Sequence, residues 1–183
     1  PVSFILPKKP ATLLKNALPH DDTPVEIRFD NLNAEVTFAA GNLKCRLIEG
    51  RYPNYNSVIP TDNPCQMTID RRALLGSVKR ILPFASESSQ SIRLRLGIGQ
   101  VEASSEDIDF ATSAKETIVC DYNGTPMSIG FKGPSLVEIL SSLTSDEVLM
   151  ELADPSRPCL IFPSEQPEGQ NILMLIMPML LND

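Results

Sequence analysis

The stretch Met67-Thr68-Ile69-Asp70-Arg71-Arg72-Ala73-Leu74-Leu75 joins a short apolar strand pattern directly to the start of an apolar helix pattern. The same order occurs at residues 4–18 and at residues 127–137, so the paired apolar helix positions recur about every 61 residues along the chain. Each helix pattern is followed by strand patterns, at 25–48, 92–122 and 148–177. The sequence therefore predicts three tandem copies of one βαβββ unit.

A single βαβββ unit has one helix to cover one small sheet, so two units are expected to pair into one compact domain. The predicted fold class is α+β, with tandem βαβββ repeats and helices on one face of antiparallel sheets. Three repeats then give an incomplete domain at residues 1–56 and a complete domain at 57–183. The segment Gly50–Pro60 is the predicted connector, because its prolines keep it out of the neighbouring helix and strands. The chain is accordingly expected to be the C-terminal part of a longer protein.

Residues 25–47 show the clearest strand signal in the sequence. Apolar and polar residues alternate at 25–29, 34–38 and 43–47, and turn-forming sequences rich in asparagine and glycine separate the three runs. This pattern predicts an antiparallel meander with one buried face and one solvated face.

Composition favours a globular protein without a metal or cofactor. The chain has 183 residues, 42% of them hydrophobic, and its four cysteines form no Cys-x-x-Cys pair. With one histidine, His20, in a turn-like sequence, a zinc site or a catalytic base has little support. No apolar run reaches the ~20 residues that a membrane-spanning helix needs, and the first residues lack a signal-peptide pattern. We expect a soluble, cytoplasmic protein with reduced thiols and no membrane partner.

The basic residues gather in the predicted helices of an acidic protein. The net charge is −7, yet segments 8–18, 70–85 and 131–145 carry eight basic residues against two acidic ones. Solvent-facing lysines and arginines on amphipathic helices are one explanation, and a confined nucleic-acid-binding face is the other. Pairs at the start of two repeats, Lys8-Lys9 and Arg71-Arg72, favour contacts with phosphates, which would be independent of base sequence.

No pattern of an enzyme is present. The sequence lacks Gly-x-Ser-x-Gly, P-loop and His-Glu-x-x-His motifs. Gly97-Ile98-Gly99 lies between two strand patterns and predicts a hairpin turn rather than a dinucleotide site. The acidic sequence 104–109 is interpreted as a solvated strand end in preference to a metal site.

The terminal run Ile172–Leu181 is interrupted only by Pro178 and otherwise apolar, where a half-exposed strand should alternate. A strand buried on both faces is one explanation. The other is an adaptable groove for a partner's peptide, because Pro178 disfavours a long central strand and methionine suits irregular apolar surfaces.

Two motifs over the repeats carry a family resemblance. The sequence Leu47-Ile48-Glu49-Gly50-Arg51-Tyr52-Pro53-Asn54-Tyr55, together with Met177-Pro178-Met179, resembles the bacterial DNA sliding clamp, the beta subunit of DNA polymerase III. The resemblance covers essentially the whole chain. It implies the DNA-clamp fold, with three domains of two repeats each and two protomers closing into a ring around duplex DNA. Residues 1–56 would be the second half of the middle domain, and 57–183 the third domain.

The resemblance also implies a non-catalytic processivity factor with three kinds of contact. A peptide groove would receive a linear motif from the DNA polymerase III alpha subunit, the clamp loader and repair polymerases; its implied residues are Pro53, Val58, Ser156, Pro158, Leu175, Ile176, Met177, Pro178 and Met179. The implied DNA-facing residues are Lys8, Lys9, Lys15, Arg51, Arg71, Arg72, Lys79 and Arg80. Closure of the homodimeric ring would use Pro83 and Phe84.

This sequence departs from the family pattern at Ser57, Ser89, Ser135 and the extension Asn182-Asp183, which affects the rim of the implied groove. A free-standing DNA-binding scaffold or single-strand-binding module without ring closure is the alternative function.

Overall fold

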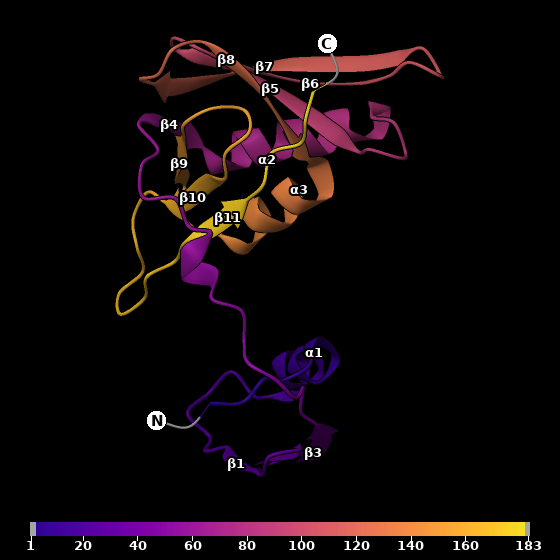
Figure 1. The fold of residues 1–183 in the computed structure, drawn as a ribbon, viewed down its shortest axis with the longest axis vertical. Helices are drawn as coiled ribbons and strands as arrows, with labels where there is room; N and C mark the ends of the chain where they lie inside the picture. Colours follow the sequence, from indigo (N-terminus) through magenta and orange to yellow (C-terminus); the bar gives the residue numbers. More distant parts are fainter. Residues whose placement is uncertain (1–2, 182–183) are drawn as a thin grey trace. The chain divides into compact units, whose positions relative to one another are not determined.

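The computed structural model describes residues 3–181, which divide into two compact units at the boundary between Asn54 and Tyr55. The element order confirms three successive βαβββ repeats, with the first strand of the first repeat reduced to an isolated bridge between Ile5 and Ile48. Figure 1 draws both units and labels most of their helices and strands.

The first unit is a helix with a three-stranded meander. It contains α1 (Lys8–Ala17), β1 (Glu26–Phe29), β2 (Asn33–Phe38) and β3 (Gly41–Arg46). The sheet order is β1-β2-β3 and both pairings are antiparallel, as the alternation predicts. Val36 pairs with Ile27 on one side and with Leu43 on the other, so the apolar positions of all three strands share one face.

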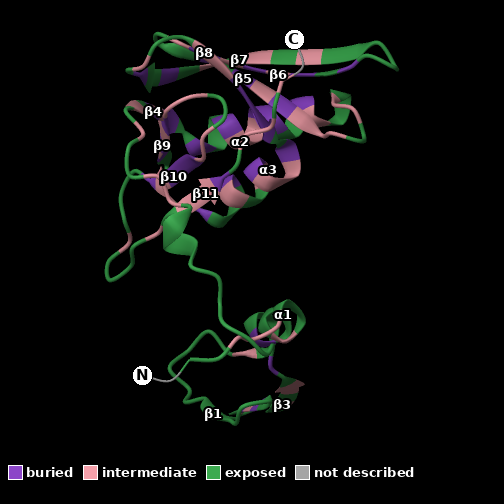
Figure 2. Ribbon diagram, in the orientation of Figure 1, coloured by how far each residue is buried: buried purple, intermediate pink, exposed green. Residues whose placement is uncertain are grey.

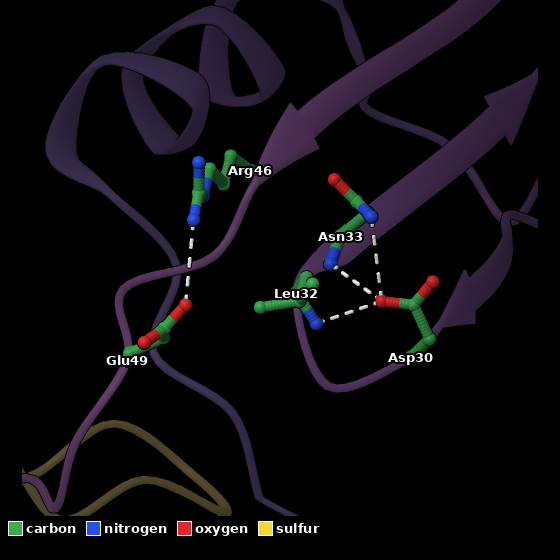
Figure 3. A network of polar contacts seen from close by, with 5 residues as sticks. All are labelled: Asp30, Leu32, Asn33, Arg46 and Glu49. Atoms are coloured by element: carbon green, nitrogen blue, oxygen red, sulfur yellow. Dashed lines mark hydrogen bonds and ion pairs between the residues drawn. The ribbon is translucent and has the colours of Figure 1, made fainter.

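The β1–β2 turn is closed by one carboxylate (Figure 3). Asp30 Oδ1 accepts hydrogen bonds of 2.7 Å from the backbone N–H groups of both Leu32 and Asn33. These bonds, the first of them the larger cause, hold the pKa of Asp30 below its ordinary value. Because the folded state lowers this pKa, the stabilisation is present above the unfolded carboxyl's pKa and is lost as the pH falls. Arg46, the last residue of β3, forms a separate ion pair with Glu49 at 3.4 Å.

Burial in the first unit is smaller than the strand pattern predicts. Leu14, Ala34, Val36 and Leu47 are buried, but β1 is exposed along its whole length, and Ile27 is 52% exposed. The predicted buried face of β1 is therefore wrong for the described residues. The reason is geometric: α1 packs on the β3 side of the sheet, and β1 forms the opposite edge.

The second unit contains two repeats that share one sheet. The second repeat is β4 (Cys65–Asp70), α2 (Arg71–Ile81), the short 3₁₀ helix η2 (Leu82–Phe84), β5 (Ser91–Gly97), β6 (Gln100–Asp107) and β7 (Thr112–Tyr122). The third is β8 (Met127–Lys132), α3 (Gly133–Ser142), β9 (Glu147–Leu152), β10 (Cys159–Pro163) and β11 (Met174–Ile176). The eight strands are ordered β11-β10-β9-β4-β7-β6-β5-β8, every pair antiparallel. A further 3₁₀ helix, η1 (Tyr55–Ser57), opens the unit.

The core of the second unit lies between its two helices and the sheet. Helices α2 and α3 pack against each other, and their apolar faces meet alternate residues of every neighbouring strand (Figure 2). Leu74, Val78, Leu136 and Leu140 are fully buried at this contact. The start of α2 is fixed locally, because Asp70 Oδ1 accepts a 2.7 Å hydrogen bond from Ala73 N–H. The two helices therefore occupy one side of the sheet, as the repeat pattern predicts.

The turns of the second unit agree with the sequence. Gly97 pairs with Gln100, which leaves Ile98-Gly99 as a two-residue hairpin turn, and Gly99 adopts a φ of 76°. The acidic sequence 104–109 ends β6 as predicted, but it is only partly solvated: Ser105 and Asp107 are buried, and Asp107 accepts hydrogen bonds from the backbone N–H groups of Asp109 and Phe110. All four cysteines are unpaired thiols; Cys120 and Cys159 are buried, while Cys45 and Cys65 are half-buried. Among residues 3–181, no helix is long and apolar enough to cross a membrane.

Gly124 allows β7 to end against β4. Tyr122 donates a 2.8 Å hydrogen bond to Thr125 O, and burial, followed by the neighbouring Cys65, raises the pKa of Tyr122 to about 12. A Cβ at position 124 would overlap the Tyr122 hydroxyl and lie 2.7 Å from Cys65 Sγ. The turn therefore requires a residue without a side chain.

Gly124→Ala should lower the free energy of unfolding by about 1–3 kcal/mol, because the new methyl group overpacks this turn. Gly97→Ala is the control, since its Cβ would find its nearest neighbour, Gln100 O, at an ordinary 3.7 Å. Urea denaturation of both variants measures the difference, and equal midpoints would contradict the proposed clash.

Candidate functional site

The exposed lysines in the first turn of α1 do not stabilise the helix. Lys8 and Lys9 occupy its first turn, which has no acidic residue and no side-chain N-cap. Positive charge is disfavoured at a helix N-terminus, so local helix stability does not explain this pair. Lys15, in the last turn, is also exposed. This arrangement suits contact with an external anion such as a phosphate.

Arg71 is a correction to the predicted DNA-facing set. Its side chain is buried at the α2–α3 contact, where Nε donates to Ser145 O at 2.6 Å and Nη1 donates to Leu140 O at 3.1 Å. The guanidinium thus satisfies carbonyl groups at and after the C-terminal end of α3. Arg71 is the first residue of α2, and that position faces α3 rather than solvent. It is a structural residue.

The other basic residues of α2 remain at the surface. Lys79 and Arg80 are exposed in its last turn. The side chain of Arg72 is 76% exposed and lies 3.8 Å from Asp146, too far for a strong pair. Arg80 makes two 2.6 Å hydrogen bonds to the Glu116 carboxylate on β7, which raise the pKa of Arg80 and lower that of Glu116. Arg80 therefore already has an anionic partner within the chain.

The helices are not equally basic. Within its described bounds, α3 contains no lysine or arginine and carries an exposed glutamate, Glu138. Lys132 precedes the helix and is exposed. The exposed basic residues of the predicted DNA-facing set therefore lie on α1 of the first unit and on α2 of the second, and Arg51 is also exposed.

Five of the predicted groove residues come together in the second unit. Cys159 pairs with Ile176, which places Pro158 beside the end of β11. Asp154 turns the preceding loop by accepting hydrogen bonds from Ser156 N at 2.8 Å and Ser156 Oγ at 2.6 Å. The structure thereby brings together two segments distant in sequence, namely Ser156 and Pro158 with Leu175, Ile176 and Met177.

The remaining groove residues come from other segments of the chain. Val58 is 58% exposed just after η1, and Pro53 belongs to the first unit. Met179 continues past β11 and forms an isolated bridge with Gly130 of β8. Sequence reasoning missed Asn63, whose Nδ2 donates 3.0 Å hydrogen bonds to Glu151 O and Pro158 O and ties the segment after Val58 to this loop. No motif marks it, because the contact joins residues far apart in sequence.

The terminal strand differs from one of the two sequence interpretations. β11 has three residues and is an edge strand, so a strand buried on both faces is wrong. The pairing with β10 ends at Ile176, and Pro178 follows two residues later. Met177 and Leu180 are 56% and 87% exposed, which leaves an apolar surface at the chain's end.

The predicted ring-interface residues lie in η2. Pro83 and Phe84 are both exposed, and Phe84 retains 40% of its accessible surface. Pro83 also lines a cavity of about 390 Å³ with Lys79 of α2, Val137 of α3 and residues of the loop before β5. Two further exposed apolar side chains, Ile108 and Phe110, occupy the β6–β7 turn, where the sequence indicated only a solvated strand end.

The second unit corresponds closely to a known protein family. Residues 56–180 match the family model described as "DNA polymerase III beta subunit, C-terminal domain". The chain belongs to the DNA polymerase III beta subunit family. Among its curated relatives, the "Beta sliding clamp" of Caulobacter vibrioides is 26% identical over 93% of this chain, and that of Haemophilus influenzae is 28% identical over 98%. The chain spans 45% and 48% of their respective lengths.

Solved structures of sliding clamps share the fold of this chain of the DNA polymerase III beta subunit family. A DNA polymerase sliding clamp from Pseudomonas aeruginosa, solved with a ligand, aligns with a TM-score of 0.88 at 24% identity, covering 97% of this chain and 48% of that one. A sliding clamp from Caulobacter crescentus aligns at 0.84 with 25% identity, covering 97% and 46%. The predicted α+β clamp fold is confirmed. The individual DNA, groove and interface residues stay predictions, apart from Arg71.

Arg71→Met should lower the free energy of unfolding by about 2–4 kcal/mol, because it leaves the buried carbonyl of Leu140 and the partly buried carbonyl of Ser145 without their charged donor. Arg72→Met is the matched control one residue away, and its stability should change by less than about 0.5 kcal/mol. Thermal and urea denaturation measure both. If Arg72→Met proved the more destabilising, the structural role of Arg71 would be wrong.

Proposed function

We propose that this chain is part of a sliding clamp, a processivity factor that encircles duplex DNA and tethers the replicative polymerase. The observation that carries the proposal is the family match over 56–180, joined to a first unit whose exposed basic helix cannot be explained by helix stability. Residues 1–56 would be the second half of a middle clamp domain, and 57–183 the third domain. Two copies of the complete protein would close the ring in the cytoplasm.

The proposed role on DNA is positional rather than chemical. Lysines and arginines on α1 and α2 would make weak, sequence-independent phosphate contacts, chiefly through Lys8, Lys9, Lys15, Arg72 and Lys79. Encirclement would make dissociation depend on opening the ring, so the contacts can be weak enough to permit sliding. Pro83 and Phe84 would belong to the closing interface. No group of three metal-ligating side chains that could hold an ion occurs in the described part of the chain.

The proposed tether is a groove beside β11. Its surface would combine the exposed side chains of Met177 and Val58 with the Ser156–Pro158 loop, and an apolar surface of this kind suits a short peptide with aromatic or leucine side chains. The partners would be the DNA polymerase III alpha subunit, the clamp loader and repair polymerases. Tethering raises the effective concentration of such enzymes at the DNA without contributing chemistry.

The groove is tested by titrating a labelled peptide with a Gln-x-x-Leu-Phe-like motif into the intact protein. The double variant Met177→Ala, Met179→Ala should bind at least about tenfold more weakly, because two apolar side chains are removed from the contact surface. Leu180→Ala is the control, since Leu180 is the most exposed apolar residue of the same segment but lies outside the predicted groove. Equal affinities for the wild type and the double variant would reject the groove.

Ring topology is tested with DNA of two shapes. After loading by the clamp loader, the intact protein should stay on closed circular duplex and be lost when a nuclease linearises the DNA, because a ring slides off a free end. Gel filtration of the protein–DNA complex measures retention. A free-standing scaffold or single-strand binder would instead stay bound to the linear product, and that outcome would replace the clamp proposal.

A further inference from the structure

The residues of β11 do not specify their own register. Every residue from Ile172 to Met177 is apolar. In most strands, alternation of apolar and polar residues fixes the register, since a slip by one residue would bring polar side chains into the core. Here a slip would exchange one apolar set for another. The side-chain pattern therefore leaves the register weakly determined.

The register nevertheless decides which side chains are presented outward. In the structure, Ile176 is buried in the core, and Ile172 and Met174 pack against it. Leu175 and Met177 lie on the other face, where Met177 is 56% exposed. β11 pairs with β10 over three residues only, so few ladder hydrogen bonds resist a slip.

Two contacts outside the strand hold it at its ends. Before β11, the Gln166 side chain bonds to both backbone groups of Ile172: Nε2 donates to Ile172 O at 2.8 Å, and Oε1 accepts from Ile172 N at 2.7 Å. After β11, Met179 N–H donates to Gly130 O at 2.8 Å. A Cβ at Gly130 would lie 3.0 Å from Met179 O and 2.7 Å from Leu181, so this second contact needs glycine.

We propose that Gln166 is a positioning residue of the peptide groove, which fixes the register of β11 so that Leu175 and Met177 face outward. The inference rests on the proposed function of that groove. Gln166 acts through Ile172 rather than by touching the peptide. Its side chain is exposed, so shortening it creates no cavity in the core.

The two hydrogen bonds between Gln166 and Ile172 suggest a variant that tests this contact specifically. An amide offers one donor and one acceptor group, which match the C=O and N–H of Ile172. A carboxylate offers acceptors only, whereas a protonated carboxyl group regains a donor. Gln166→Glu should therefore lose the contact at neutral pH and recover it as the pH falls through the carboxyl's pKa.

The experiment uses the intact protein with methyl-labelled methionine, backbone hydrogen exchange and the labelled peptide described above. In Gln166→Ala, the Met177 methyl resonance should shift, exchange across 174–176 should accelerate, and peptide affinity should fall about tenfold, the loss expected for two hydrogen bonds. The melting temperature should fall by only about a few degrees, because two exposed hydrogen bonds are a small part of the stability of the whole unit. Gln170→Ala is the control from the same exposed loop, because the hydrogen bond of Gln170 to Pro167 O comes from its backbone and is retained.

The outcomes separate this inference from the proposed function. Recovery of the wild-type methyl signal by Gln166→Glu on acidification, and not by Gln166→Ala, supports the positioning role. Unchanged exchange in Gln166→Ala overturns it, and so does faster exchange with unchanged peptide affinity. If the wild-type protein fails to bind the peptide, the groove itself is wrong, while the methyl and exchange measurements still decide what sets the register.

Discussion

The first strand of each repeat in the second unit pairs with the sheet of the other repeat. β4 begins the second repeat but is bonded along its whole length to β9 of the third, from Cys65–Leu152 to Asp70–Glu147. β8 begins the third repeat and is paired along its length with β5 of the second. Strand pairing of β4 within its own repeat is limited to three residues of β7. Neither repeat can form this sheet alone, because the second repeat supplies β4 to pair with β9 and the third supplies β8 to pair with β5.

The helix contact follows from this exchange of strands. Each helix comes directly after an exchanged strand, so α2 and α3 are delivered to the same side of the common sheet and must pack together. The burial of Arg71 belongs to the same geometry, since the first residue of α2 arrives beside the end of α3. A charged side chain in this place is tolerated because backbone carbonyl groups satisfy its guanidinium. The basic residues of α2 that remain exposed are Arg72, Lys79 and Arg80, which lie in its first and last turns where this packing does not cover them.

Local chemistry made much of the fold predictable. The alternation in 25–47, the Gly97–Gly99 hairpin and the strand-to-helix order at 67–75 are short-range signals, and each is confirmed. The predictions that failed concern tertiary contacts, which depend on the element that packs against a residue. Arg71 and Arg72 are adjacent residues of the same type, so their sequence does not distinguish them. In the structure Arg71 faces α3, whereas Arg72 faces solvent. The exposure of Ile27 likewise depends on which part of the sheet the helix covers, and the length of β11 depends on where its partner strand ends. The candidate site was predictable chiefly through a family resemblance, because its residues come from separate loops and strands.

The long separation between β4 and β9 also sets an order of events during synthesis. The β4 residues leave the ribosome well before the strand with which they pair, and the β5–β6–β7 meander, whose pairings are local, is complete in the interval. Contacts distant in sequence form late, because the intervening chain must lose entropy before they contribute. Until β9 emerges, an apolar strand and the buried face of α2 lack their partners. The same exchange of strands that makes the finished unit cooperative therefore makes its nascent form the stage most exposed to aggregation and to chaperone binding.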